Sequence, residues 1–477
     1  MAKVSTKWTI ILYLFFDTDT ANVVQMAYRI ELRVRLIVTR HGNRQPCGIL
    51  VGGGEKTISL LLKIKKSMKK KQILFVCQYF YPETFRGNDI AFHLAKEGHD
   101  VHVVTGIPNY PKGEFFSGYG VFKKRHEVIN GVRITHLPIV PRGEDNKIML
   151  MLNYFSYLFF GCIWTFFHAL WNKYDMVFCQ QLSPVTMSSP AVLYKKMRHV
   201  PLYTWVLDLW PESLTAAGGI NNKFILGFFD WFVKSEYKNS DKILTSSRSF
   251  DKSILEYGDY QDKIIYYPQW SDGASGASRS GFTIPKSLQE LSNGDNFIVM
   301  FAGAVGEAHG MDCNMQAALK TKTHKNIKWV IVGDGRRLDW VKSFVKDNDL
   351  GDTVITLGRF PSETMPLFFE KADVMLVSLT DSPLFNMYSP AKISSYMAAE
   401  RPIIAVLNGE GGDVIKAAEC GWNVEVGDSD GLAELVIRLS SADKKELIDK
   451  GRKGKEYYDN FFTKEKCLRK LDEIIGS

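Results

Sequence analysis

KQILFVCQYFYPETFRGNDIAFHLAKEGHDVHVVTG, residues 71–106, is the stretch that decides the fold. KQILFVCQY predicts a strand, IAFHLAKEG predicts a helix that ends at Gly98, and DVHVVTG predicts the next strand. Short apolar runs that alternate with helical patterns are typical of parallel βαβ units. The chain is therefore expected to be an α/β protein built on parallel sheets.

The same alternation continues to residue 426 and divides into two series. The first series adds strands, expected to join one sheet, at 131–140, 176–181, 201–208, 242–247 and 263–268. The second series predicts strands at 296–303, 328–335, 353–358, 372–379, 402–408 and 422–426.

Between the two series, residues 273–295 are rich in Gly, Ser and Asn, which is typical of a linker or loop. We therefore expect two doubly wound parallel-sheet units, at 68–272 and 296–455, that face each other across a cleft. Ligands of such sheets bind beyond the carboxyl ends of the strands, so the main site is expected in that cleft.

Composition excludes several classes of protein. With 45% hydrophobic and 23% charged residues, the 477-residue chain is neither disordered nor fibrous, and its length predicts two or three domains. The seven cysteines are odd in number and scattered, with no CxxC pair. This pattern indicates a reducing compartment and argues against a structural zinc site. The folded body is therefore expected in the cytoplasm, without a bound metal.

The net charge of +8 is concentrated near the N-terminus. Residues 1–71 contain 14 Lys/Arg and 4 Asp/Glu, a net of +10, which leaves −2 for residues 72–477. A nucleic-acid-binding protein carries its basic surface on the folded domain, so no nucleic-acid partner is expected. An anionic membrane suits a basic leader as well. Residues 1–67 contain a short apolar run without a convincing signal-cleavage site and are expected to be a poorly packed basic extension.

Residues 148–171 contain no Lys, Arg, Asp or Glu, which makes this segment long and apolar enough to span a bilayer. A spanning helix would put the strands before and after it on opposite sides of the membrane, although both are expected in one sheet. The alternatives are a buried crossover helix, or a helix or helical hairpin in the membrane interface. Its aromatic content and the basic neighbours Arg142, Lys147 and Lys173 favour the interface, so we expect peripheral attachment.

Glycine-rich turns follow strands of the second unit. GAVGEAHG at 303–310, GDG at 333–335 and GEGGD at 409–413 would let backbone approach a phosphate, and the last opens a helix. Lys392 lies in the first turn of a nearby helix. A tight turn and a solvated lysine are the ordinary explanations of these features. Two phosphate-favouring elements that converge nevertheless favour a diphosphate site.

Two loops of the first unit also follow strands. PETFRGND occupies 82–89, and DLWPES places Asp208 and Glu212 at the carboxyl end of a strand, facing the expected cleft. A helix cap would explain either carboxylate equally well. His309, in the second unit, is more often a cap or surface residue than a catalyst.

These motifs together resemble a known family. QYFYPETFRGND, HDVHVVTGIPNYPKG, SPVTMSSPA, VLDLWPES, SPAKISSYMAAERPIIA and GEGGDVI occur in the order found in the retaining family-4 glycosyltransferases of the GT-B fold. Within that family, the chain is similar to the fucosamine-transferase-like enzymes of bacterial surface-polysaccharide assembly. The resemblance covers roughly residues 69–475.

The resemblance implies transfer of a sugar from a nucleoside diphosphate, with UDP expected and an N-acetylated deoxy-hexosamine as a candidate sugar, to a lipid-linked saccharide. The anomeric configuration would be kept, and no metal or other cofactor would be needed. The second unit would bind the nucleotide sugar and the first unit the acceptor, while a helix at 456–477 would cross back to the first unit. The enzyme would serve O-antigen or capsule synthesis at the cytoplasmic face of the bacterial inner membrane.

The chain departs from the family pattern at the diphosphate site. The Arg and Lys of the usual G-R-L-x-x-x-K-G string are missing from residues 303–310, and the E-x7-E pair aligns with Met387 and Ser395. By the resemblance, Lys392 is then the expected diphosphate cation, and Asp208 or Glu212 would orient or deprotonate the acceptor hydroxyl. The other donor contacts are expected from Gly87, Asn88, Gly303, His309, Gly333, Arg359, Gly411 and Gly412.

Two other functions fit the sequence. A GT-B nucleotide-sugar epimerase would need acid and base residues around the donor sugar and no acceptor surface, which the apolar segment 148–171 disfavours. A catalytically inactive sugar-nucleotide-binding scaffold would account for the missing carboxylate pair.

Overall fold

The computed structural model describes residues 70–144, 146–218, 222–271 and 282–476. The basic extension expected at 1–67 lies outside the described residues, as does the first part of the expected linker at 273–295. The described part of that linker contains a short helix, α10 (Lys286–Ser292).

The first sheet has eight strands in the order β3-β4-β2-β1-β5-β6-β7-β8. The edge strand β3 (His126–Ile129) pairs antiparallel with β4, and the other neighbours pair in parallel. The parallel strands are β1 (Gln72–Val76), β2 (Asp100–Gly106), β4 (Val132–Leu137), β5 (Met176–Gln181), β6 (Leu202–Val206), β7 (Lys242–Thr245) and β8 (Ile264–Tyr266). The strands predicted in the first series thus all join this sheet. The sequence does not predict β3, whose four residues are exposed or half-buried and lack an apolar run.

The second sheet is parallel throughout, with its six strands in the order β11-β10-β9-β12-β13-β14. Its strands are β9 (Phe297–Ala302), β10 (Ile327–Val332), β11 (Val354–Gly358), β12 (Val374–Ser378), β13 (Ile403–Val406) and β14 (Gly421–Val424). The strand order reverses between β9 and β12, and in the first sheet between β1 and β5. Such reversals are where doubly wound sheets bind ligands, beyond the carboxyl ends of the strands.

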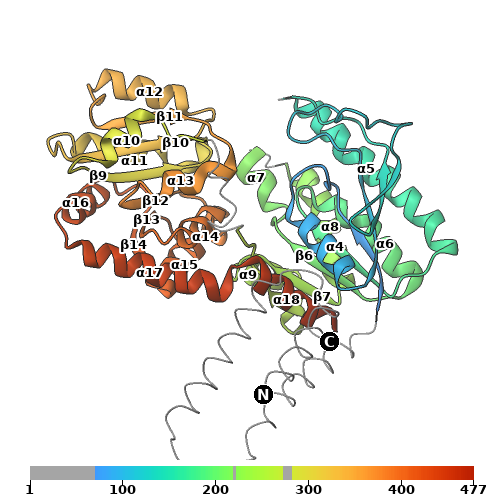
Figure 1. Ribbon diagram of the computed structural model, residues 1–477. Helices are drawn as coiled ribbons and strands as arrows, with labels where there is room; N and C mark the ends of the chain where they lie inside the picture. The colour runs from blue at the N-terminus through green and yellow to red at the C-terminus, as the bar shows by residue number, and fades with distance from the viewer. Residues whose placement is uncertain (1–69, 145, 219–221, 272–281, 477) are drawn as a thin grey trace, which may run out of the picture. The chain divides into compact units, whose positions relative to one another are not determined.

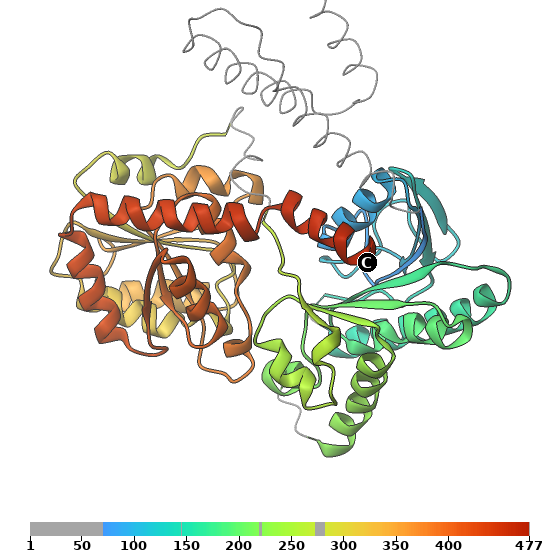
Figure 2. The ribbon, with the colours of Figure 1, turned by 90° about the horizontal axis from the view of Figure 1, so that it is seen from below.

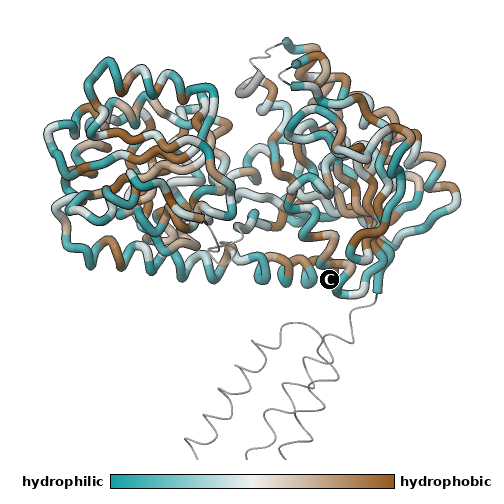
Figure 3. Tube along the Cα trace, turned by 45° about the horizontal axis from the view of Figure 1, so that its top comes forward, coloured by the Kyte–Doolittle hydropathy of each residue, from teal (hydrophilic) through white to brown (hydrophobic). Residues whose placement is uncertain are grey.

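Helices pack on the two sheets (Figures 1 and 2). On the first sheet, α6 packs against both α5 and α8. The helices of this part are α4 (Arg86–Lys96), α5 (Lys147–Trp171), α6 (Ser189–Arg198), α7 (Glu212–Gly218), α8 (Lys223–Asn239) and α9 (Phe250–Leu255). Those that follow β9 are α11 (Met311–Lys320), α12 (Leu338–Asp347), α13 (Met365–Phe369), α14 (Ala391–Ala398), α15 (Glu410–Ala418) and α16 (Ser429–Ser440). Figure 3 shows that the hydrophobic residues concentrate on the strands inside each sheet.

Two helices, not one, end the chain: α17 (Lys444–Phe461) and α18 (Lys464–Gly476). The apolar side of α18 belongs to the same core as β1, β2 and β5. Two lysine side chains add to this attachment, because Lys242 donates to the Ile474 carbonyl at 2.8 Å and Lys470 donates to the Tyr266 carbonyl at 2.6 Å. The last helix therefore belongs to the core of the first sheet, although the chain reaches it from the second.

Helix α5 is the crossover between β4 and β5, as a single helix and not a hairpin. Asn146 caps it by accepting hydrogen bonds from the amides of Ile148 (3.0 Å) and Met149 (3.1 Å). Its buried residues form a stripe with a spacing of four: Asn153, Tyr157, Gly161, Thr165 and Ala169. Only 22% of its most apolar stretch is buried, so α5 is not a fully buried crossover helix.

We predict that Leu471→Ala destabilises the first-sheet core by about 2–5 kcal/mol, because Leu471 of α18 is fully buried there. Ile448→Ala is the control, since this side chain of α17 is 66% exposed and its truncation should cost at most about 0.5 kcal/mol. Urea denaturation followed by tryptophan fluorescence measures both values. Equal effects of the two substitutions would show that α18 is not part of this core.

Candidate functional site

Lys392 lies at the switch point of the second sheet. Helix α14 starts immediately after Pro390, so Lys392 is its second residue and reaches toward the carboxyl end of β9. Its Nζ lies 3.7 Å from the centroid of the Phe301 ring. The side chain also crosses Gly303, where an added Cβ would lie 2.5 Å from Lys392 Cε, and Gly303 has a φ of +134°. Position 303 therefore has to be glycine for the lysine to reach this place.

The Lys392 ammonium is buried and has no hydrogen-bond partner in the described part of the chain. Burial lowers the pKa of its amino group to about 7, because a desolvated charge is disfavoured. The face of the Phe301 ring offers an attraction to the cation but no acceptor atom. A buried cation without an acceptor is costly in a folded protein, so this group is ready to receive an anion.

His309 lies beside Lys392 but is not a second cation. Its Nδ1 accepts a hydrogen bond from the Gly306 amide at 3.3 Å, and its ring meets the Phe301 ring edge-on at 6.0 Å. Burial and the neighbouring Lys392 lower the pKa of the imidazole to about 4. His309 is therefore neutral near pH 7 and can offer only a neutral hydrogen bond to a ligand.

Gly333 and Arg359 follow the two neighbouring strands, β10 and β11. An added Cβ at Gly333 would lie 1.8 Å from the Gly303 carbonyl oxygen, so this glycine is explained by close packing of two loops. Arg359 is exposed and has no hydrogen-bond or ion-pair partner among the described residues. Arg359 is thus free to meet a ligand, whereas Gly333 shapes the loop that carries Gly303.

The GEGGD turn places Gly411 and Gly412 in the first turn of α15, both buried. Gly411 packs near Pro390, at the start of α14, with an ideal Cβ 3.3 Å from its Cδ. Gly412 instead lines a surface cavity of about 750 Å³ beside β14, and neither Lys392 nor Gly303 lines that cavity. The described geometry therefore does not gather Lys392 and both glycines into one pocket.

Glu410, in the same turn, is a buried carboxylate that the sequence does not single out. It accepts hydrogen bonds from the amides of Arg248 (3.2 Å) and Ser249 (3.1 Å) and from the Ser249 hydroxyl (2.9 Å). Nearby, the Ser247 hydroxyl donates to the Met387 carbonyl at 2.5 Å. The loop after β7 is thus tied to the turn that opens α15 and to Met387, one of the positions where the family carboxylates are missing.

Asp208 follows β6, and its carboxylate accepts a hydrogen bond from the Ser183 hydroxyl at 2.8 Å. Burial raises the pKa of this carboxyl, while hydrogen bonds from Ser183 and Tyr388 oppose the rise. Tyr388, which the sequence also does not single out, accepts a hydrogen bond from the Leu209 amide at 2.9 Å. Asp208 therefore lies where the loop after β6 meets the segment just before Lys392.

Glu212 does not share this position. It starts α7 and accepts a hydrogen bond from the Ser253 hydroxyl of α9 at 2.5 Å, and its other oxygen is buried without a partner. The side chain thus contacts α9, in a structural role at a helix start. Of the two carboxylates expected near the acceptor, Asp208 is the better candidate.

Gly87 and Asn88 have structural roles in α4. An added Cβ at Gly87 would lie 1.9 Å from the Gln180 side-chain oxygen, so glycine lets α4 pack closely on β5. The Asn88 amide donates to the Glu83 carbonyl at 2.6 Å, while its own oxygen is buried without a partner. Gly87 is therefore explained by packing, and only the Asn88 oxygen remains available to a ligand.

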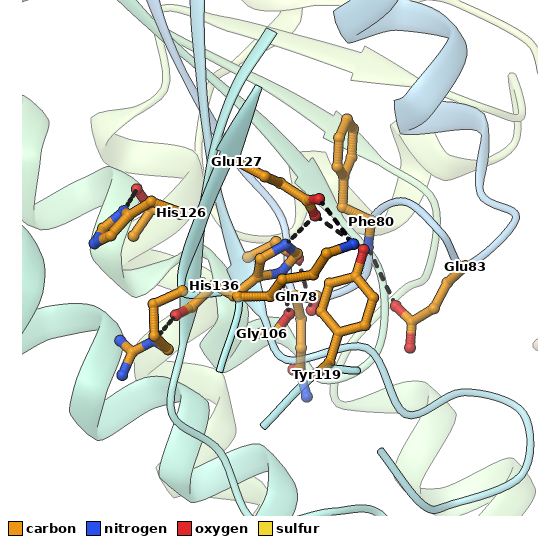
Figure 4. A network of polar contacts seen from close by, with 12 residues as sticks. Gln78, Phe80, Glu83, Gly106, Tyr119, His126, Glu127 and His136 are labelled. Carbon is orange, nitrogen blue, oxygen red and sulfur yellow. Dashed lines mark hydrogen bonds and ion pairs between the residues drawn. The ribbon is translucent and has the colours of Figure 1, made fainter. Parts of the chain in front are cut away.

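Glu83 organises the loops at the switch point of the first sheet. It accepts hydrogen bonds from the amides of Asn109 (2.7 Å), Tyr110 (2.6 Å) and Phe80 (3.2 Å). Burial raises the pKa of this carboxyl to about 7, against the effect of those amides. Figure 4 shows Glu83 near a second polar group, in which Glu127 Oε1 lies 2.8 Å from His136 Nε2 and 3.0 Å from the Tyr119 hydroxyl. The sequence does not predict either group, because no motif marks their members and the Glu83 group joins residues 26 and 27 positions apart.

A metal site was not expected. Among the described residues, no three His, Cys, Asp or Glu side chains come together in an arrangement that could hold a metal ion. The cationic group found at the switch point is Lys392.

Comparison with known proteins shows what the chain is similar to. Residues 296–442 match the model of the glycosyl transferases group 1. The probable glycosyltransferase WbjE of Pseudomonas aeruginosa is 24% identical over 305 residues, covering 60% of this chain and 73% of WbjE. The amylovoran biosynthesis glycosyltransferase AmsK of Erwinia amylovora is 25% identical over 149 residues, covering 31% of this chain and 36% of AmsK.

The architecture also matches solved structures. The crystal structure of Anabaena HepE in complex with UDP and glucose superposes with a TM-score of 0.58 at 14% identity, covering 85% of this chain and all of that one. This likeness confirms the GT-B fold expected from the sequence motifs. Residues 296–442 are therefore similar to the glycosyl transferases group 1, within a chain that has the GT-B fold.

Proposed function

We propose that the chain is a retaining, family-4 glycosyltransferase of the fucosamine-transferase-like kind. It transfers a sugar from a nucleoside-diphosphate sugar to a lipid-linked saccharide in bacterial surface-polysaccharide synthesis, such as O-antigen or capsule. UDP is the proposed nucleotide, since it is the nucleotide bound in the HepE structure of the same fold. The group 1 match and the polysaccharide function in AmsK's name support the reaction class.

The single observation that carries this proposal is the buried, unpartnered ammonium of Lys392. It lies at the carboxyl end of β9, next to Gly303, whose missing side chain leaves room for the lysine stem. When the bond between the anomeric carbon and the diphosphate breaks, negative charge builds up on the leaving phosphate. Lys392 stabilises that charge at the place where the usual Arg and Lys of the family are missing.

The acceptor side is proposed to use Asp208. The acceptor oxygen forms its new bond to the anomeric carbon as the bond to the diphosphate breaks, and the acceptor proton leaves to the departing phosphate or to Asp208. Asp208 lies next to Tyr388, and Tyr388 belongs to the segment that leads to Lys392. Its carboxylate can therefore orient the acceptor hydroxyl toward the sugar that Lys392 holds by its diphosphate.

An inactive scaffold is the alternative that the missing carboxylates favour. Met387 uses its carbonyl to accept from Ser247, and Ser395 is hydrogen-bonded to the Ala391 carbonyl at 3.3 Å, so neither position supplies a carboxylate. Release of UDP from a panel of UDP-sugars, with a lipid-diphosphate-linked saccharide as acceptor, separates the possibilities. Turnover excludes the scaffold, while a changed sugar without acceptor indicates an epimerase.

Lys392→Met should lower kcat/KM for the nucleotide sugar by about 10²–10³-fold, because the leaving diphosphate loses its main cation. The matched control is Lys342→Met, which removes an exposed lysine whose ion pair with Asp339 is 4.0 Å long. Steady-state kinetics with varied donor measures both. Unchanged kinetics in Lys392→Met would remove this residue from the mechanism.

The pH dependence of the reaction should report the Lys392 amino group. Its pKa is about 7 without ligand, so kcat/KM for the donor should fall as the pH rises through 7 and the ammonium is lost. Lys392→Arg keeps its charge at all these pH values, so kcat/KM of this variant should not fall as the pH rises through 7. A profile of kcat/KM from pH 6 to 9 for both proteins tests this, and identical limbs in the two would argue against it.

The same burial should make Lys392 costly for stability. The folded protein holds this amino group at a pKa of about 7 instead of 10.5, so the unfolded chain binds more protons between these values. The penalty is full below pH 7 and shrinks as the pH rises toward 10.5. Lys392→Met should therefore unfold at a higher temperature than the wild type at pH 6, with a smaller difference at pH 9. Thermal unfolding at the two pH values checks the order.

We propose that no metal ion is needed, since Lys392 supplies the charge that would otherwise come from one. Activity should persist in EDTA at a level close to that with added Mg²⁺. Loss of turnover in EDTA that added Mg²⁺ restores would contradict this.

A further inference from the structure

Exposed apolar side chains are concentrated on two helices of the first-sheet part. Of the 22 large hydrophobic side chains that are exposed among the described residues, 15 lie on α5 or α8. Those of α5 are Ile148, Met151, Leu152, Phe155, Phe159, Phe160, Ile163, Phe166, Phe167, Leu170 and Trp171, and those of α8 are Phe224, Ile225, Phe228 and Trp231. We call these 15 side chains the α5–α8 surface. Apolar groups clustered in this way mark an interaction site.

The two helices contribute to one continuous surface. Phe155 of α5 and Phe228 of α8 are in contact, with ring centroids 6.4 Å apart. The first half of α8 has no buried residue, and Phe224 is 90% exposed while Trp231 is 63% exposed. This half of α8 therefore extends the apolar face of α5, a feature that the sequence of α8 alone does not reveal.

The geometry of α5 excludes a membrane-spanning arrangement. The strands on either side of it, β4 and β5, belong to the same sheet. Its inner stripe, with Asn153 and Tyr157, is buried against the protein along the length of the helix. The helix can therefore only lie flat on a bilayer, with its outer face in the interface.

Charges around the α5–α8 surface favour an anionic bilayer. Helix α5 contains no acidic residue, and the exposed Lys147 and Lys173 lie at its two ends. Helix α8 begins at the exposed Lys223. Of its two acidic residues, Glu236 is buried, and Asp230 forms an ion pair with Lys234 at 2.7 Å. Aromatic side chains bordered by lysines suit the headgroup region of an anionic leaflet.

The inner sides of both helices reach the loops around Asp208. Tyr154, next to Phe155 on α5, is close enough to Asp208 and Arg142 for both to influence the pKa of its hydroxyl, which burial raises. Phe229, next to Phe228 on α8, packs against Trp210 with ring centroids 5.0 Å apart. The Trp210 indole donates to Ser183 at 3.0 Å, and Ser183 in turn donates to Asp208.

We propose that the α5–α8 surface docks in the plane of an anionic lipid bilayer and holds Asp208 at the membrane surface. The contact between Phe155 and Phe228 is then the point where the saccharide of a lipid-linked acceptor emerges from the bilayer. Their sequence neighbours, Tyr154 and Phe229, are the residues that reach the loops around Asp208. The position of the acceptor rests on the proposed function, whereas the docking itself does not.

The docking is tested by co-sedimentation of the full chain with vesicles of 70% phosphatidylethanolamine and 30% phosphatidylglycerol. Phe224→Ser combined with Trp231→Ser removes two exposed aromatic side chains of α8 and leaves α5 intact. Binding should weaken by roughly tenfold for each side chain removed. Wild-type binding should also weaken at 0.5 M NaCl and on vesicles of phosphatidylcholine alone, because screening or removing the anionic charge removes the attraction of the lysines.

Ile448→Ser is the control variant, since Ile448 is 66% exposed, about as much as Trp231, but lies on α17 and outside the α5–α8 surface. It should bind vesicles as the wild type does. UDP binding by isothermal titration should be the same for all three proteins, which shows that the variants are folded. If the wild type binds UDP but not vesicles, the docking proposal is wrong and the proposed function stands. If the wild type binds vesicles but not UDP, the proposed function is wrong and the docking proposal stands.

A second copy of the chain could also cover the apolar surface. Sedimentation velocity in the absence of lipid decides this, because docking to lipid predicts a wild type with the same oligomeric state as the α8 variant. An oligomer that dissociates in the α8 variant, together with unchanged vesicle binding, would assign the surface to subunit contact and overturn the proposal.

Discussion

The close crossing of two loops at the switch point of the second sheet determines where the candidate site can form. Gly333 packs against the carbonyl of Gly303, and the Val305 amide donates to the Asp334 carbonyl at 2.9 Å. This crossing holds Gly303 in a backbone conformation that other residues rarely adopt, and the missing side chain leaves the space that the Lys392 stem occupies. Glycine at these positions thus gives the Lys392 side chain the space that it occupies.

A buried ammonium with no acceptor lowers the stability of the fold but favours the binding of an anion. Removing water from the Lys392 group strengthens its attraction to any anion that enters, at the cost of a fold that carries an unpaired charge while the anion is absent. The neutral His309 beside it adds a polar group without adding charge repulsion. An anion bound at Lys392 would remove this penalty, so such a ligand and the folded state would stabilise each other.

Much of the fold could be predicted from the sequence, because parallel strands buried on both faces appear as short, continuous apolar runs. The exception, β3, is an exposed edge strand with no such run. Lys392 could be found because its motif is local. Glu83, Tyr388 and Glu410 could not, because each acts on backbone amides of residues distant in the chain. Only folding brings these groups together.

The apolar helices show the same division between local pattern and tertiary context. The composition of α5 predicts a membrane affinity, but only the sheet topology shows that this helix does not span a bilayer. Helix α8 carries lysines and acids among its aromatic residues and reads as an ordinary amphipathic helix. Its first half becomes part of the α5–α8 surface only because α5 lies beside it at Phe155 and Phe228. Tyr154 is close enough to Asp208 for its pKa to be influenced by that carboxylate, and Phe229 packs against Trp210. The proposed lipid contact and the proposed placement of the acceptor therefore depend on the same two helices.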